Sequence, residues 1–228
     1  MLLYYITDRS QFAGDETARR SRLLTTIVEA ARCGVDYIQL REKGLSAREL
    51  ETLAHAAVQC LRTENQELKT AFLINSRTDI ALSCAAQGVH LRSQDVSPSE
   101  VKKIWTLSGG TLTPVTVGVS CHTRAEVAHA AQEGADFAVF GPVFEKEKTL
   151  TSPAGLEGLR EACQEKIPVL ALGGITLENA KACIQAGATG IAAIRLFQQN
   201  EMAKVVAALR GSNVGVRPQT ADLGPPQG

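Results

Sequence analysis

The sequence of 228 residues has little of what marks membrane, nucleic-acid-binding or secreted proteins. It contains no apolar run near the roughly 18 to 20 residues that a membrane-spanning helix requires. Lysine and arginine (24) balance aspartate and glutamate (24), so the formal net charge is zero and no basic footprint for nucleic acid is expected. The opening residues MLLYYITD lack the basic start and small-residue cleavage site of a signal peptide, and they predict a strand.

Cysteine is present, but not in any pattern that binds metal or builds a disulfide framework. No two cysteines form a CxxC pair, and several lie in alanine-rich stretches where a thiol behaves as a small apolar group. We therefore expect reduced cysteines and a cytoplasmic protein. The six cysteines are Cys33, Cys60, Cys84, Cys121, Cys163 and Cys183.

Short apolar runs alternate with longer amphipathic runs along the chain. The apolar runs are typical of parallel strands that are covered on both sides. We expect strands at Leu2–Thr7, Tyr37–Leu40, Ala71–Asn75, Gly88–Leu91, Val115–Val119, Phe137–Phe140, Val169–Leu172 and Gly190–Ile194. We expect helices near Arg22–Cys33, Ala47–Glu64, Thr78–Cys84, Pro98–Leu107, Ala125–Glu133, Leu156–Gln164, Glu178–Ala186 and Met202–Leu209. Capping residues precede several of these helices, at Ser46, Ser97, Thr123 and Thr176.

This alternation favours the α/β class and a single (β/α)8 TIM barrel over residues 1–210. A doubly wound parallel sheet is the second choice, because it would not need eight evenly spaced units. The remaining segment, 211–228, is rich in glycine and proline without a period, and we predict a disordered C-terminal tail.

Polar residues follow most of the predicted strands at their carboxyl ends. In a barrel these ends meet at one mouth, where cations, amides and hydroxyls would suit a phosphorylated, anionic substrate. Arg41 and Lys43 share a face with Gln39, although a solvated loop edge would show the same pattern. The segments concerned are Gln39–Lys43, Asn75–Arg77, His90–Asp95, Ser120–His122 and Gly173-Gly174.

Two of these segments suggest specific roles. Gly173-Gly174 offers bare backbone N–H groups after the seventh strand, and with Ala193-Ile194 it predicts a phosphate site; an ordinary turn is the alternative. His122 is the natural acid or base at neutral pH, unless it is a structural histidine bonded to Ser120 or to a turn carbonyl. His90, within the fourth strand, is interpreted as structural.

The motifs resemble those of the thiamin phosphate synthase/TenI family of (β/α)8 proteins. The resemblance covers about residues 2–210 in the family's order and spacing. It is carried by YYITD (4–8), QLREK (39–43), INSRTDIAL (74–82), GVHLRSQD (88–95), GVSCHT (118–123), GADFAVFGPVF (134–144), ALGGIT (171–176) and AGATGIAAI (186–194).

The family contains two activities. The synthase joins an aminopyrimidine-methyl pyrophosphate to a thiazole phosphate with Mg2+ and releases pyrophosphate. The TenI-type tautomerase aromatises a thiazole carboxylate phosphate by proton transfer through a histidine, with no cofactor. Both act on small phosphorylated substrates, not on nucleic acid or membranes, and a homo-oligomer is left open.

The resemblance assigns roles to the residues at the mouth. His122 matches the tautomerase histidine, and Ser120 a pyrophosphate or pyrimidine contact. Asp95 matches one magnesium ligand of the synthase. Gln39, Arg41, Lys43 and Asn75 match pyrophosphate and pyrimidine contacts, and Gly173, Gly174, Ala193 and Ile194 match the thiazole phosphate site.

Three departures from the synthase pattern bear on the choice. Ser76 stands where the synthase has its second magnesium aspartate, and a hydroxyl lacks the charge that a hard cation favours. Arg92 stands where the family has glycine, and it could bind pyrophosphate or a substrate carboxylate. The loop Glu145–Thr149 replaces a threonine-rich lid. These departures favour the tautomerase slightly, with the synthase as the alternative and a non-catalytic barrel that binds thiazole or thiamin phosphate as a third hypothesis.

Overall fold

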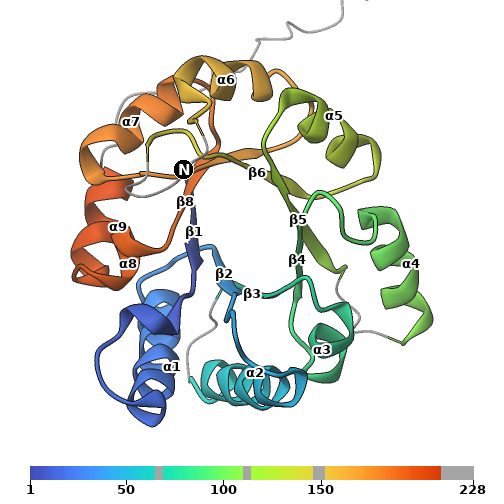
Figure 1. The fold of residues 1–228 in the computed structure, drawn as a ribbon, viewed down its shortest axis with the longest axis vertical. Coiled ribbons are helices and arrows are strands. Elements are labelled where there is room, and N and C mark those ends of the chain that lie inside the picture. Colours follow the sequence, from blue (N-terminus) through green and yellow to red (C-terminus); the bar gives the residue numbers. More distant parts are fainter. Residues whose placement is uncertain (65–68, 110–113, 146–151, 212–228) are drawn as a thin grey trace, which may run out of the picture.

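Eight parallel strands close into a barrel, and helices surround it (Figure 1). The computed structural model describes residues 1–64, 69–109, 114–145 and 152–211. Each strand pairs with the next along the chain, and β8 pairs with β1, so the predicted (β/α)8 barrel is confirmed and the doubly wound sheet is wrong. The strands are β1 (Leu2–Ile6), β2 (Tyr37–Leu40), β3 (Ala71–Asn75), β4 (Gly88–Leu91), β5 (Thr116–Cys121), β6 (Phe137–Phe140), β7 (Val169–Leu172) and β8 (Gly190–Ala193).

The helices follow the expected order, and all four predicted capping residues accept a backbone N–H of their helix. Each of those four N-termini is a capping box, in which the third helical residue bonds back to the cap. The helices are α1 (Glu16–Arg32), α2 (Ala47–Arg62), α3 (Thr78–Ser83), α4 (Pro98–Leu107), α5 (Arg124–Gln132), α6 (Gly155–Ala162), α7 (Leu177–Gln185), α8 (Arg195–Gln198) and α9 (Met202–Gly211).

The sequence patterns did not reveal three features of the helices: the true start of α1 and the two short helices η1 and α8. Helix α1 begins at Glu16, six residues before the expected start at Arg22, because its first turns are polar and show no apolar period. Asp15 caps it, and a Glu16–Arg20 ion pair supports its first turn. The short 3-10 helix η1 (Arg9–Gln11) and helix α8 are too short for periodicity to reveal.

Alternation along the strands divides the core into two parts. Outward-facing residues pack under the helices, and inward-facing residues fill the barrel itself. Inside, Phe137 stacks on Tyr37 at 4.7 Å between ring centroids, and Tyr4 meets both rings edge to face. This aromatic layer makes the barrel a packed core. Side chains that could meet a substrate therefore lie above this layer, at the carboxyl ends of the strands.

The predicted tail lies outside the described residues except for Gly211, which is the last residue of α9 rather than the first of the tail. Within the described ranges no helix has the length and apolarity needed to cross a membrane. All six cysteines are unpaired, as expected.

Candidate active site

The ends of β2 and β3 bring two predicted substrate contacts together. Strand pairing sets Asn75 beside the end of β2, and the Gln39 Nε2 donates to Asn75 Oδ1 at 3.0 Å. Gln39 is only 1% exposed, so its amide is held inside the mouth by this bond. The two amides form one edge of the site.

The chain of hydrogen bonds continues from β3 to the loop after β4. The Asn75 Nδ2 donates to Ser76 Oγ at 3.3 Å, and the Ser76 hydroxyl donates to Asp95 Oδ2 at 2.6 Å. Arg92 donates to the same carboxylate from its backbone N–H and, through Nη2, to Oδ1 at 2.9 Å. Partial burial of Asp95 disfavours its charged form, but the hydrogen bonds from Arg92 and Ser76 outweigh burial and hold its pKa below the usual value. The two residues at the positions that the resemblance gives to magnesium ligands, Ser76 and Asp95, are thus in contact, and Arg92 lies beside them.

These residues offer a magnesium ion few protein ligands. Mg2+ is commonly held by one or two carboxylates together with substrate phosphates and water. Asp95 supplies one carboxylate, and Ser76 supplies a hydroxyl in contact with it. No group of three or more histidine, cysteine, aspartate or glutamate side chains that could hold a metal occurs within the described ranges. A metal here would need oxygen ligands from a bound substrate.

A buried histidine supports Ser120 from below. His90 points into the barrel from β4, with Nδ1 3.1 Å from the Tyr4 hydroxyl and Nε2 2.8 Å from Ser120 Oγ. Burial, assisted by the positive charge of Arg41, lowers the pKa of His90 to about 3. His90 is therefore neutral at physiological pH and orients the Ser120 hydroxyl, in agreement with its structural interpretation.

His122 lies at the rim, just beyond the end of β5, and is exposed. Its Nδ1 is 2.6 Å from the carbonyl oxygen of Gly141, after β6. A carbonyl only accepts, so Nδ1 carries the proton and the neutral ring has its lone pair on Nε2. A bond to a turn carbonyl is what the structural alternative for His122 named, and it occupies Nδ1 alone.

An open cavity of about 590 Å3 lies at the ends of β7 and β8. All four residues predicted for the thiazole phosphate site line it: Gly173, Gly174, Ala193 and Ile194. Gly173 and Gly174 have φ values of +102° and +62°, a backbone conformation that favours glycine. His122 is not among the residues that line this cavity.

Arg195 is a lining residue that the sequence interpretation missed. It begins α8 directly after Ile194, and it is the cation among the described residues that line the cavity. The only available signal was an arginine one residue beyond the predicted phosphate site. The predicted loop Glu145–Thr149 falls outside the described residues from 146 onward, although Glu145 itself lines the cavity.

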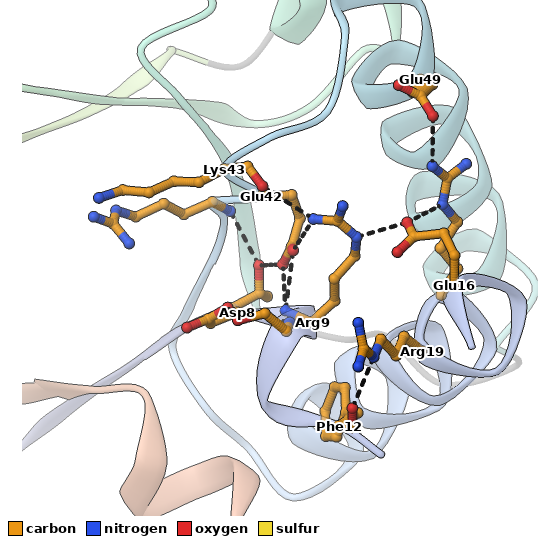
Figure 2. Close-up of polar contacts among 12 residues, drawn as sticks. Asp8, Arg9, Phe12, Glu16, Arg19, Glu42, Lys43 and Glu49 are labelled. Atoms are coloured by element: carbon orange, nitrogen blue, oxygen red, sulfur yellow. Dashed lines mark hydrogen bonds and ion pairs between the residues drawn. The ribbon is translucent and has the colours of Figure 1, made fainter. Parts of the chain in front are cut away.

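The pair Arg41 and Lys43 lies beyond the end of β2, and the residue between them, Glu42, was overlooked. Glu42 is buried behind the strand end, where it accepts hydrogen bonds from Thr7 and Arg9 (Figure 2). Burial raises the pKa of Glu42, and the bonds from Thr7 and Arg9 partly offset that rise. Figure 2 shows the Lys43 side chain extending away from Glu42 and Arg9.

The barrel, with its glycine turn, its cavity and the polar residues at the ends of its strands, has the layout that is typical of (β/α)8 enzymes. Residues 3–197 match the family profile described as thiamine monophosphate synthase, and the chain belongs to that family. The chain is thus an enzyme of the thiamin phosphate synthase/TenI type.

Individual relatives agree with this assignment. The chain is 39% identical to the putative thiamine-phosphate synthase 2 of Aquifex aeolicus, over 86% of this chain and 96% of that protein. It is 40% identical to the thiamine-phosphate synthase of Syntrophomonas wolfei, over 84% and 86%. Among solved structures, the thiamine phosphate pyrophosphorylase from Pyrococcus furiosus superposes with a TM-score of 0.74 at 30% identity, covering 92% of this chain and 94% of that one. The names of these relatives support the synthase alternative better than the tautomerase that the departures favoured.

Proposed function

We propose that the protein is a thiamin-phosphate synthase. In this reaction the ring nitrogen of a thiazole phosphate bonds to the methylene carbon of an aminopyrimidine-methyl pyrophosphate. The carbon–oxygen bond to pyrophosphate breaks, and pyrophosphate leaves with the electron pair. The enzyme must therefore hold two anions at once and stabilise the charge of the leaving group.

The observation that carries the proposal is the presence of two separate polar regions at one mouth. The first comprises Gln39, Asn75 and the cations that follow β2, and it suits the pyrimidine pyrophosphate. The second is the glycine-lined cavity at β7 and β8, which suits the thiazole phosphate. In the closed strand order β1 lies between β2 of the first region and β8 of the second, so the two anions would bind at separate positions on the same rim. A tautomerase acts on one phosphorylated substrate and needs only the second region.

Magnesium fits this scheme as an ion held jointly by Asp95 and the substrate. When bound, it would neutralise charge on the departing pyrophosphate. Ser76 would hold a water or the Asp95 carboxylate, and Arg92 would add a positive charge beside them. Ser120, oriented by His90, would donate to a pyrophosphate or pyrimidine oxygen or nitrogen.

A tautomerase remains the second candidate because of His122. Its bond to the Gly141 carbonyl leaves Nε2 as a base at the rim, which is what proton transfer on a thiazole carboxylate phosphate needs. That activity would be lost in His122→Asn, since an amide cannot take up the proton.

Both activities are tested side by side on the purified protein. We expect thiamin phosphate from the two substrates with Mg2+, and a loss of about a hundredfold in kcat/KM in Lys43→Gln. Lys181→Gln, on the outer helix α7, is the matched control and should match the wild type. Tautomerisation without thiamin phosphate formation would replace the proposal with the second candidate. Inactivity in both assays, with tight binding of thiazole phosphate, would leave the non-catalytic barrel.

A further inference from the structure

We infer that Glu42 is a positioning residue that fixes Arg41 and Lys43 in place for the pyrophosphate, an inference that rests on the proposed function. These residues directly follow β2, which ends at Leu40, and among them Glu42 is buried, Arg41 is half-buried and Lys43 is exposed. The Glu42 side chain is 1% exposed, whereas the Lys43 residue is exposed. A buried acid between two cations of the site is thus directed away from them.

Glu42 is held by donors from the end of β1 and from η1. The Thr7 hydroxyl donates to Oε1, and the Arg9 backbone N–H donates to Oε2 at 3.0 Å. The Arg9 guanidinium adds a third bond from Nη1 to Oε2 at 3.2 Å. A buried carboxylate without such partners would be costly, so these contacts account for its presence behind the strand.

The same two residues, Thr7 and Arg9, also bond to the backbone on either side of Glu42. The Arg41 backbone N–H donates to Thr7 Oγ1 at 3.0 Å, and Arg9 Nη1 donates to the Lys43 carbonyl at 3.3 Å (Figure 2). Thr7 and Arg9 are therefore each bonded both to Glu42 and to one of its neighbours. The segment from Arg41 to Lys43 is fixed at three consecutive residues, and Glu42 is the centre of that arrangement.

This arrangement matters because Arg41 and Lys43 have long, flexible side chains. Each loses much of its rotamer entropy when it is immobilised on a ligand. If the backbone of this segment is already fixed, binding does not carry the further entropic cost of ordering it. Both cations are then close to the pyrophosphate site before the substrate binds. Because Arg9 is paired with Glu42, the acid does not neutralise the cations of the site.

Arg9 is also paired on its outer side, and this pairing provides a control. Its Nε contacts Glu16 at 2.7 Å, and Glu16 in turn contacts Arg20. The Glu16 side chain is 45% exposed, and its ion pairs in the described part of the chain are with Arg9 and Arg20, not with Arg41 or Lys43. Glu16→Gln thus removes an ion pair from the same arginine while it leaves the bonds of Glu42 in place.

The test compares Glu42→Ala, Glu42→Gln and Glu16→Gln by amide hydrogen exchange and by kinetics. Glu42→Gln keeps the volume and one acceptor oxygen, so it should fall between Glu42→Ala and the wild type, and it keeps the test usable if Glu42→Ala does not fold. We expect the Arg41 amide to exchange about tenfold faster in Glu42→Ala, and the KM for the pyrimidine pyrophosphate to rise about tenfold. The KM for thiazole phosphate and both readouts of Glu16→Gln should stay within about twofold of the wild type.

The two readouts separate this inference from the proposed function. Unchanged exchange at Arg41 in Glu42→Ala overturns the positioning role, whatever the enzyme does. Faster exchange with an equal rise in KM for both substrates also overturns it, because the effect would then be a general loss of structure. Faster exchange in a protein whose wild type makes no thiamin phosphate leaves Glu42 as the residue that fixes the segment and rejects the proposed synthase.

Discussion

The hydroxyl of Ser76 donates a 2.6 Å hydrogen bond to the carboxylate of Asp95, at the point where the family resemblance implies two magnesium aspartates. Ser76 has φ +59°, in the left-handed region that aspartate and asparagine adopt more readily than most residues. An aspartate could therefore adopt the backbone conformation of this position with less strain than most residues.

Ser76→Asp should strengthen magnesium binding. A second carboxylate next to Asp95 supplies the charge that a hard cation favours, and it fits the φ of the site. We expect the half-saturating Mg2+ concentration for thiamin phosphate formation to fall about tenfold, with a larger Mg2+-induced rise in melting temperature. Ser93→Asp adds the same charge at an exposed position of the loop after β4, which also carries Asp95, and its Mg2+ response should equal that of the wild type. An unchanged Mg2+ dependence in Ser76→Asp would remove this position from the metal site.

His90 should make the protein less stable in acid. Its pKa is about 3 in the folded state, against an ordinary value near 6.5, because burial disfavours the charged ring. Between these values the unfolded chain binds one more proton than the folded protein at this site. The free energy of unfolding should therefore decrease by about 1.4 kcal/mol for each pH unit below pH 6.5 from this residue alone.

Urea unfolding at pH 7, 6, 5 and 4 measures this effect. His90→Gln, which cannot titrate, is the matched variant. The free energy of unfolding of the wild type, relative to that of His90→Gln, should decrease by about 1.4 kcal/mol for each pH unit below pH 6.5. A constant difference across that range would mean that His90 is charged, or free to become charged, in the folded protein.

The fold was accessible from sequence because each of its determinants is local. Strand and helix periods, capping residues such as Ser46 and Thr176, and the count of alternating units all act within a few residues. Helix α1 shows the limit of this reasoning. Its first turns are fixed by Asp15 and by ion pairs, and neither leaves an apolar period in the sequence.

From the sequence, the site could be predicted only as the group of residues that follow the strands at their carboxyl ends. The rule that ligands gather at the carboxyl ends selected Gln39, Asn75 and Gly174, all of which lie at the mouth. It could not select Glu42, which lies beside two such residues but points away from them, nor Arg195, which follows a strand end. Their roles depend on contacts with β1 and on the cavity shape, and these exist only in three dimensions.

Gly174→Ala should weaken thiazole phosphate binding through the shape of the turn. A Cβ at Gly174 would lie 2.8 Å from the Glu145 carbonyl oxygen and from Phe144 Cβ, so the exit of β6 would have to move. We expect the KM for thiazole phosphate to rise about tenfold, and stability to fall by about 1 kcal/mol from the positive φ. Gly34→Ala, with φ +84° and no atom within 4 Å, should lose similar stability and keep the KM. If both variants raised the KM equally, backbone strain rather than the turn would be responsible.

Arg195→Ala should weaken the same substrate through charge. Arg195 lines the cavity directly after the backbone groups of Ala193 and Ile194, and a guanidinium there would add a charge-assisted bond to the phosphate. We expect the KM for thiazole phosphate to rise five- to tenfold, roughly 1 to 1.4 kcal/mol, with the KM for the pyrimidine pyrophosphate within about twofold of the wild type. Arg195→Lys keeps the charge and should recover most of the loss. Equal loss in Arg195→Lys and Arg195→Ala would show that the arginine acts through packing of α8 and not through the phosphate.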